Sequence, residues 1–146
     1  MMNFSQPKWR AIITGASSGI GKNTALAFAK AGIDVALVSR SQERLESVAK
    51  AARETGVESK AYQLDLANLE TVKEEISSIA KDFGAIDILV NNAGMGYTNP
   101  LGNTSLEDWQ QVINLNLTSV FQCVQGILPQ MRARSSGTII NVVSIA

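Results

Sequence analysis

A glycine-rich segment near the start of the chain constrains its fold more than any other feature. The apolar residues 11–13 run into Thr14, and a helical pattern begins at Ile20. The join between this predicted strand and helix contains three glycines: Gly15, Gly19 and Gly21. Glycine there allows a tight turn and a close approach of the backbone to a ligand, and the start of a helix offers unpaired N–H groups to an anion. The segment therefore predicts a site for a phosphate or a dinucleotide pyrophosphate, the alternative being a plain turn.

Composition argues against several other classes of function. The 146 residues, 45% of them hydrophobic, are enough for one domain with a substantial core. The formal net charge is zero and no run of like charges occurs, so neither nucleic acid nor an anionic membrane surface is expected as a partner. Cys123 is the only cysteine and the sequence has no histidine, which argues against a disulfide and against a metal site of imidazoles or paired thiolates. No apolar run has the length of a signal peptide or a membrane span, so we expect a soluble cytoplasmic protein.

Short apolar runs alternate with longer helical patterns along the chain. Strands are expected at residues 9–14, 35–38, 60–64, 86–90 and 138–143. Helices are expected at 20–31, from Ser41 to Gly56, after an N-cap at Asn68, and from Ser105 to Pro129 or a few residues beyond, with a loop at 95–104. The third helix carries an apolar stripe of Leu69, Val72, Ile76, Ile79 and Phe83. This alternation predicts a doubly wound Rossmann fold of three αβα layers, with a parallel sheet of order 3-2-1-4-5.

The spacing of the glycines points to one family of such folds. It is G-x-x-x-G-x-G rather than G-x-G-x-x-G, and with Thr14 ahead of it the segment resembles the Thr-Gly-x-x-x-Gly-x-Gly motif of the short-chain dehydrogenase/reductase family. Further features agree with that family in order and spacing: Asp65-Leu66 after the third strand, Asn91-Asn92-Ala93-Gly94 after the fourth, Asn116 in the long helix and Ser144 after the fifth. The resemblance implies an NAD(P)-binding domain over residues 1–146. It covers the first half to three-fifths of a complete member, so we expect a C-terminally incomplete fold.

The resemblance implies a role for each segment in holding a nicotinamide cofactor. Its phosphates would be contacted by backbone amides and small hydroxyls of Ser17, Ser18, Gly19, Ile20 and Gly21, and Thr14 and Gly15 of the same motif would also belong to the cofactor site. Asp65 would accept a hydrogen bond from the adenine amino group, with Leu66 beside the ring; a cap preceding a helix is a compatible structural role for Asp65. Asn92, Ala93 and Gly94 would line the nicotinamide-ribose side, the alternative being a turn that merely ends the strand.

The end of the second strand bears on the choice between NADP and NAD. An acidic residue at this place bonds the ribose 2′-hydroxyl of NAD, whereas NADP requires that charge to be absent and a cation near its 2′-phosphate. The chain has Ser39 and Arg40 here, with no carboxylate at either position. We therefore expect NADP (NADPH) in preference to NAD, because a phosphate beside Arg40 can form charge-assisted bonds. Two observations weigh against this: Arg40 could be a solvated residue at a strand end, and Ser18 stands where many NADP-dependent relatives have a basic residue.

The catalytic residues implied by the resemblance are present only in part. Ser144 would hydrogen-bond the substrate oxygen, and Asn116 would hold a water in a proton relay. Asn116 also breaks an apolar helical face, at a cost unless its amide is satisfied, whereas Asn114 points elsewhere and is expected at the surface. The family's acid/base is a tyrosine with a lysine four residues later, Y-x-x-x-K. In this chain leucines stand four residues after both tyrosines, Tyr62 and Tyr97, so the pair is missing.

The missing pair leaves three explanations open: a fragment of a longer enzyme, which we favour, one half of a split enzyme, or a nucleotide-binding module without chemistry. The intact architecture would transfer hydride between NADP(H) and a small-molecule carbonyl or alcohol substrate, of which a 3-oxoacyl thioester is one candidate. The helix at 105–131 would contribute to a homo-oligomer interface if the fold were completed. A chain ending at the fifth strand would leave a sheet edge and apolar helix faces uncovered.

Overall fold

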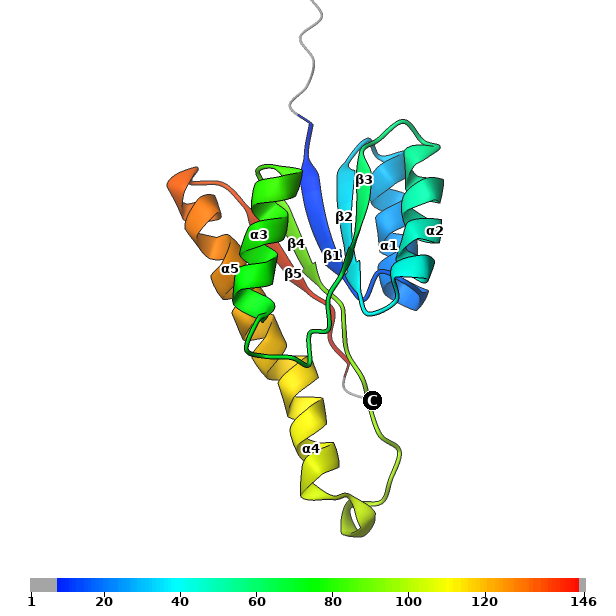
Figure 1. Cartoon of the computed structure of the whole chain (residues 1–146), viewed down its shortest axis with the longest axis vertical. Helices are drawn as coiled ribbons and strands as arrows, with labels where there is room; N and C mark the ends of the chain where they lie inside the picture. The colour runs from blue at the N-terminus through cyan, green and yellow to red at the C-terminus, as the bar shows by residue number, and fades with distance from the viewer. Residues whose placement is uncertain (1–7, 145–146) are drawn as a thin grey trace, which may run out of the picture.

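A computed structural model describes residues 8–144, which form a parallel five-stranded sheet covered by helices on both faces (Figure 1). The strands are β1 (Arg10–Thr14), β2 (Asp34–Ser39), β3 (Ser59–Gln63), β4 (Ile88–Asn91) and β5 (Thr138–Asn141). Their order is β3-β2-β1-β4-β5, and every neighbouring pair is parallel. The predicted doubly wound sheet is confirmed.

The helices are α1 (Gly19–Lys30), α2 (Gln42–Arg53), α3 (Val72–Phe83), α4 (Leu106–Ile113) and α5 (Ser119–Ala133). Alternate residues of the central strand β1 point to opposite faces of the sheet, as the pleat of a strand requires. Ala11 and Ile13 pack in one apolar cluster with α1 and α2, whereas Ile12 packs in the other with α3 and α5. The three αβα layers are therefore confirmed, with one apolar core on each side of the sheet.

The third helix begins later than its apolar stripe predicts. Asn68 is not its N-cap; Asn68 lies in a turn with Asp65 and Thr71, and Val72 is the first helical residue. Leu69 is half-buried, and its carbonyl oxygen accepts a hydrogen bond of 2.7 Å from Nε2 of Gln122 in α5. Because a side chain from another helix satisfies that carbonyl, the helix does not have to start there. Tertiary contacts of this kind are invisible to a local pattern.

The predicted long helix is interrupted once. A π-helical turn, η2 (Asn114–Thr118), joins α4 to α5, and the hydroxyl of Ser119 donates a hydrogen bond of 2.6 Å to the carbonyl of Leu115. Pro129 lies inside α5, which continues to Ala133 as predicted. The predicted loop at 95–104 contains one 3₁₀ turn, η1 (Leu101–Asn103). Together η1 and α4 project beyond the carboxyl ends of the strands, drawn in yellow and yellow-green in Figure 1.

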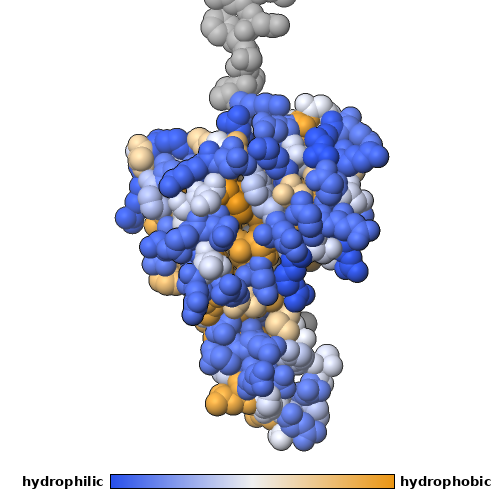
Figure 2. Space-filling view, in the orientation of Figure 1, coloured by the Kyte–Doolittle hydropathy of each residue, from blue (hydrophilic) through white to orange (hydrophobic). Residues whose placement is uncertain are grey.

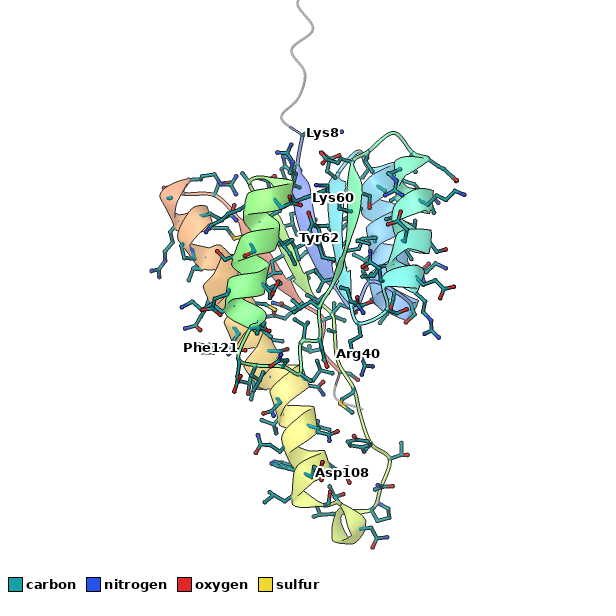
Figure 3. The ribbon with its side chains drawn as sticks, viewed as in Figure 1. Lys8, Arg40, Lys60, Tyr62, Asp108 and Phe121 are labelled. Carbon is teal, nitrogen blue, oxygen red and sulfur yellow. The ribbon has the colours of Figure 1, made fainter. Side chains whose placement is uncertain are left out.

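This projecting segment, together with η2 and the start of α5, exposes apolar side chains (Figure 2). Leu106 is 80% exposed, Trp109 54%, Leu117 63% and Phe121 60%, and Figure 3 shows Phe121 pointing away from the body of the molecule. Such an apolar surface is consistent with the predicted role of the helix at 105–131 in an oligomer, which stays a prediction. Among the helices of residues 8–144, none combines the length and the apolar character needed to cross a membrane.

Candidate nucleotide-binding site

The glycines after β1 meet two different structural requirements. Gly15 and Gly19 have φ of +63° and +54°, in the left-handed region that favours glycine. Gly21 is instead required by crowding, because a Cβ there would lie 2.3 Å from the carbonyl oxygen of Gly15 and 2.5 Å from Nδ2 of Asn92. Nothing lies within 4 Å of a Cβ built on Gly19. The turn is thus tightly packed at Gly21 and open to a ligand at Gly19.

The start of α1 leaves its first N–H groups available to a ligand. Ser18 is the N-cap, but its side chain makes no capping hydrogen bond, and the first turn of the helix holds no acidic residue. In most helices a capping side chain satisfies one of these donors. An uncapped helix start in an open glycine turn is a favourable environment for an anion.

Thr14 joins the glycine turn to the turn after β4. Its buried hydroxyl donates a hydrogen bond of 3.4 Å to the carbonyl of Val90 and accepts bonds of 3.0 Å from the backbone N–H groups of Asn92 and Ala93. In return, Nδ2 of Asn92 donates to the carbonyls of Thr14 and Gly15 at 3.2 and 3.3 Å. The predicted binding residues Thr14 and Asn92 therefore also brace the site.

A cavity of about 880 Å³ opens at this edge of the sheet. Its size falls within the range of roughly 300–1,000 Å³ found for small-molecule sites. Twelve of the fourteen residues predicted to bind the cofactor line it: Gly15, Ser17, Ser18, Gly19, Ile20, Ser39, Arg40, Asp65, Leu66, Asn92, Ala93 and Gly94. The other two, Thr14 and Gly21, are buried behind it. Sequence reasoning missed Ser41, Arg44, Leu64, Ala67, Met95, Gln111 and Leu115.

The loop between β2 and α2 places positive charge at one end of this cavity. Arg40 lies at the carboxyl end of the strands (Figure 3), and Nε2 of Gln63 in β3 donates a 2.9 Å hydrogen bond to its carbonyl. The hydroxyl of Ser41 accepts a bond of 3.4 Å from the backbone N–H of Arg44 and so caps α2. Arg40, Arg44 and Asp65 are the charged residues in the lining. No local pattern marks Arg44, which lies in α2 and is brought to the cavity by the fold.

Asp65 does not cap a helix, which was the structural role considered as an alternative, because α3 begins at Val72 with Thr71 as its N-cap; Asp65 braces the turn after β3 instead. The Oδ1 atom of Asp65 accepts a hydrogen bond of 2.9 Å from the backbone N–H of Ala67. The backbone carbonyl of Asp65 accepts a hydrogen bond of 3.1 Å from the backbone N–H of Asn68. The side chain is nevertheless exposed and lines the cavity. Bracing the turn after β3 is therefore compatible with a contact to a ligand.

Asn116 differs from its prediction in burial. It is exposed, whereas Asn114, expected at the surface, is half-buried and accepts a hydrogen bond of 2.9 Å from Gln110. The π turn changes which residues face inward, so the burial argument based on regular helical spacing was wrong. The amide of Asn116 is satisfied by one residue: Oδ1 accepts from the backbone N–H of Met95 at 2.8 Å, and Nδ2 donates to its carbonyl at 2.7 Å. Asn116 thus ties the projecting helix to the loop after β4.

Ser144 lies beyond the carboxyl end of β5, at the same edge of the sheet as the cavity. Neighbouring backbone there is held by a bond of 2.9 Å between the side chains of Asn91 and Asn141, and by one of 3.0 Å from the N–H of Val142 to the carbonyl of Asn91. Ser144 is exposed and is not one of the residues that line the cavity.

Neither tyrosine of the chain is placed to act as an acid/base at the cavity. Tyr62 and Lys60 lie on the same strand, β3 (Figure 3). The hydroxyl of Tyr62 donates a hydrogen bond of 2.6 Å to Asp82, and Oδ2 of Asp82 also lies 3.1 Å from Nζ of Lys60. Burial, and then the bond to Asp82, raise the pKa of Tyr62, which is the opposite of what an acid/base requires. The hydroxyl of Tyr97 donates to Oε1 of Gln111 at 2.8 Å, and neither tyrosine lines the cavity.

Comparison with known proteins identifies relatives of this arrangement. A 3-oxoacyl-[acyl-carrier-protein] reductase FabG of Staphylococcus epidermidis is 43% identical over 136 residues, which are 92% of this chain and 56% of the relative. The chain thus spans little more than half the length of such curated relatives. A metagenomic short-chain oxidoreductase in complex with NADP superposes with a TM-score of 0.89 and 32% identity, over 94% of this chain and 63% of that one. An NAD⁺-bound xylitol dehydrogenase superposes with a TM-score of 0.88 and 35% identity, over 94% of this chain and 54% of that one.

The family model described as short chain dehydrogenase matches residues 10–146, which is nearly the whole chain. The fold, the glycine turn and the relatives agree with this match. The chain therefore belongs to the short-chain dehydrogenase family.

Proposed function

We propose that this chain binds NADP(H) in the cavity and forms the nucleotide-binding part of an oxidoreductase that acts on a carbonyl/alcohol pair. The observation that carries the proposal is the charge at the end of β2: Ser39 and Arg40 stand there, with no carboxylate at either position, and Arg44 lines the same cavity. A 2′-phosphate favours such a site, whereas the ribose hydroxyls of NAD favour an acid. Relatives of both kinds exist, since one solved neighbour holds NADP and another NAD⁺. The preference for NADP therefore rests on this chain's own residues.

The residues around the glycine turn fit a dinucleotide. The front of the turn is open at Gly19, and the helix behind it keeps uncapped N–H groups for the pyrophosphate. Asp65 and Leu66 would hold the adenine ring. Asn92, Ala93 and Gly94 would line the nicotinamide-ribose side, where the small size of Ala93 and Gly94 allows a close approach of the backbone.

When bound, the nicotinamide ring supplies or accepts the hydride. Ser144, at the same edge of the sheet, would hydrogen-bond the oxygen of the substrate. Asn116 would contribute to a proton relay from its position beside the loop after β4, which its amide holds in place through Met95.

The proton itself requires a group that this sequence does not provide, because leucines stand where the lysine of a Y-x-x-x-K pair is needed. In the fragment hypothesis a longer chain supplies the tyrosine and lysine, and in the split-enzyme hypothesis a partner chain does. The alternative function is nucleotide binding without chemistry. The names of the curated relatives support a 3-oxoacyl thioester as the substrate.

The test combines binding and turnover on the chain as it exists. NADPH and NADH are titrated by the change in nicotinamide fluorescence, and reduction of a 3-oxoacyl thioester is followed by loss of absorbance at the nicotinamide band. We expect tighter binding of NADPH than of NADH, and no turnover. Turnover by this chain would contradict our assignment of the acid/base to a segment outside the sequence, and failure to bind either nucleotide would overturn the proposed function itself.

A further inference from the structure

Two arginines line the cavity, and neither belongs to an ion pair among residues 8–144. The ion pairs within residues 8–144 give partners to Arg53, which bonds Glu46, and to Arg134, which bonds Asp87 at 3.0 Å. Arg40 and Arg44 take part in none of these ion pairs, although both line the cavity. The glycine-rich turn opposite them adds no positive charge, because its lining residues are serine, glycine and isoleucine. Positive charge in the lining thus comes from these two arginines.

We propose that Arg44, in the first turn of α2, is a specificity-determining residue that shares the 2′-phosphate of NADP(H) with Arg40. This inference rests on the proposed function, since it concerns the same cavity. It adds to that function a second cation, which the pattern at the end of β2 does not reveal.

The position of Arg44 is set by the packing of α2. Leu45, the next residue, is fully buried in the core on that face of the sheet, and Val48 and Ala49 are buried one turn later. This packing fixes the rotation of the helix about its axis. The Ser41 cap fixes where the helix begins, and the bond from Gln63 fixes the backbone of Arg40. Both arginines therefore start from constrained backbone positions on the same rim of the cavity.

Charge balance explains why a second arginine matters. A phosphate monoester carries a charge of about −1.5 to −2 at pH 7. One guanidinium leaves it with excess negative charge, while two neutralise it and offer two planar sets of donors. Asp65 is the acidic residue in the lining, and it follows β3 rather than β2. Acidic Glu43, next to Arg44 in sequence, is not part of the lining.

The experiment compares NADPH and NADH, which differ only in the 2′-phosphate, on four forms of this chain: the natural sequence, R44Q, R40Q and K50Q. Lys50 is an exposed basic residue on the same helix that does not line the cavity, so K50Q is a matched control for loss of charge. Dissociation constants are measured by nicotinamide fluorescence. We expect R44Q to weaken NADPH about tenfold or more, as R40Q does, with NADH unchanged. K50Q should change neither, and R40Q/R44Q should bind NADPH no better than NADH.

The ratio of the two affinities in one protein cancels any loss of folded protein, so a partly unfolded variant still gives an answer. Unchanged NADPH affinity in R44Q, or an equal loss for both nucleotides, would overturn the role of Arg44 while leaving the proposed function intact. A natural chain that binds both nucleotides equally would overturn the shared phosphate site. A natural chain that binds neither would instead contradict the proposed function.

Discussion

Alanine at Gly19 and at Gly32 should have similar effects on stability, but only the substitution at Gly19 should weaken nucleotide binding. Both glycines have positive φ, +54° at Gly19 and +84° at Gly32, and at both positions an added Cβ would meet nothing within 4 Å. Each substitution therefore introduces backbone strain without a clash. An L-residue in the left-handed region costs about 1–2 kcal/mol, which lowers the Tm of a domain of this size by roughly 2–8 °C.

The two positions differ in whether they line the cavity. Gly19 lines the cavity at the start of α1, whereas Gly32 follows the other end of that helix and does not line it. The methyl group of G19A would occupy the space through which a pyrophosphate approaches the backbone. Losing one or two charge-assisted hydrogen bonds, each worth roughly 1.5–3 kcal/mol, predicts at least about a tenfold rise in the Kd for NADPH. G32A should leave that Kd unchanged.

Thermal unfolding without ligand and NADPH titration by fluorescence test both halves of this prediction. Equal affinities of G19A and G32A would refute the assignment of the phosphates to the glycine turn. A parallel loss in G32A would show that affinity follows stability rather than the geometry of the turn.

Four further predictions follow from side chains described above. Thr14→Val should destabilise the fold by about 2–5 kcal/mol in urea unfolding, because two N–H groups of the turn after β4 lose their acceptor, whereas Thr14→Ser should be mild. In the homo-oligomer predicted for the completed fold, Phe121→Glu should lower the mass measured by light scattering, because it places a charge on the exposed apolar face of the helix at 105–131; an unchanged mass would contradict the oligomer prediction. Hydrogen bonds from Tyr62 and Lys60 lower the pKa of Asp82 in the folded chain. The stability gained from this carboxylate is therefore present above its unfolded pKa and is lost as the pH falls through the lower folded pKa. The difference in unfolding free energy between the natural chain and Tyr62→Phe should shrink at acid pH. Burial raises the pKa of the Cys123 thiol to about 12, so disulfide reagents should label it only after unfolding.

The sheet could be predicted because its determinants are local. A buried strand such as 35–38 reads as a continuous apolar run, and the glycine turn indicates which strand is central. Errors appeared where a distant side chain decides the structure. The bond from Gln122 to Leu69 delays α3, and a single π turn exchanges the exposures of Asn114 and Asn116. Arg44 was missed for a different reason: an exposed arginine on a helix has no distinguishing pattern until the fold brings it to a cavity.

The hydroxyl of Thr14 has a mechanical consequence. It is bonded to the carbonyl of Val90 in β4 and to two N–H groups of the turn after β4, while its own residue precedes the glycine turn. The glycine turn and the turn after β4, which we propose hold the pyrophosphate and the nicotinamide ribose, are thus linked through one buried oxygen atom. We therefore expect that a ligand bound at one of these turns meets the other turn already ordered. Little of its binding free energy would then be lost to ordering the site.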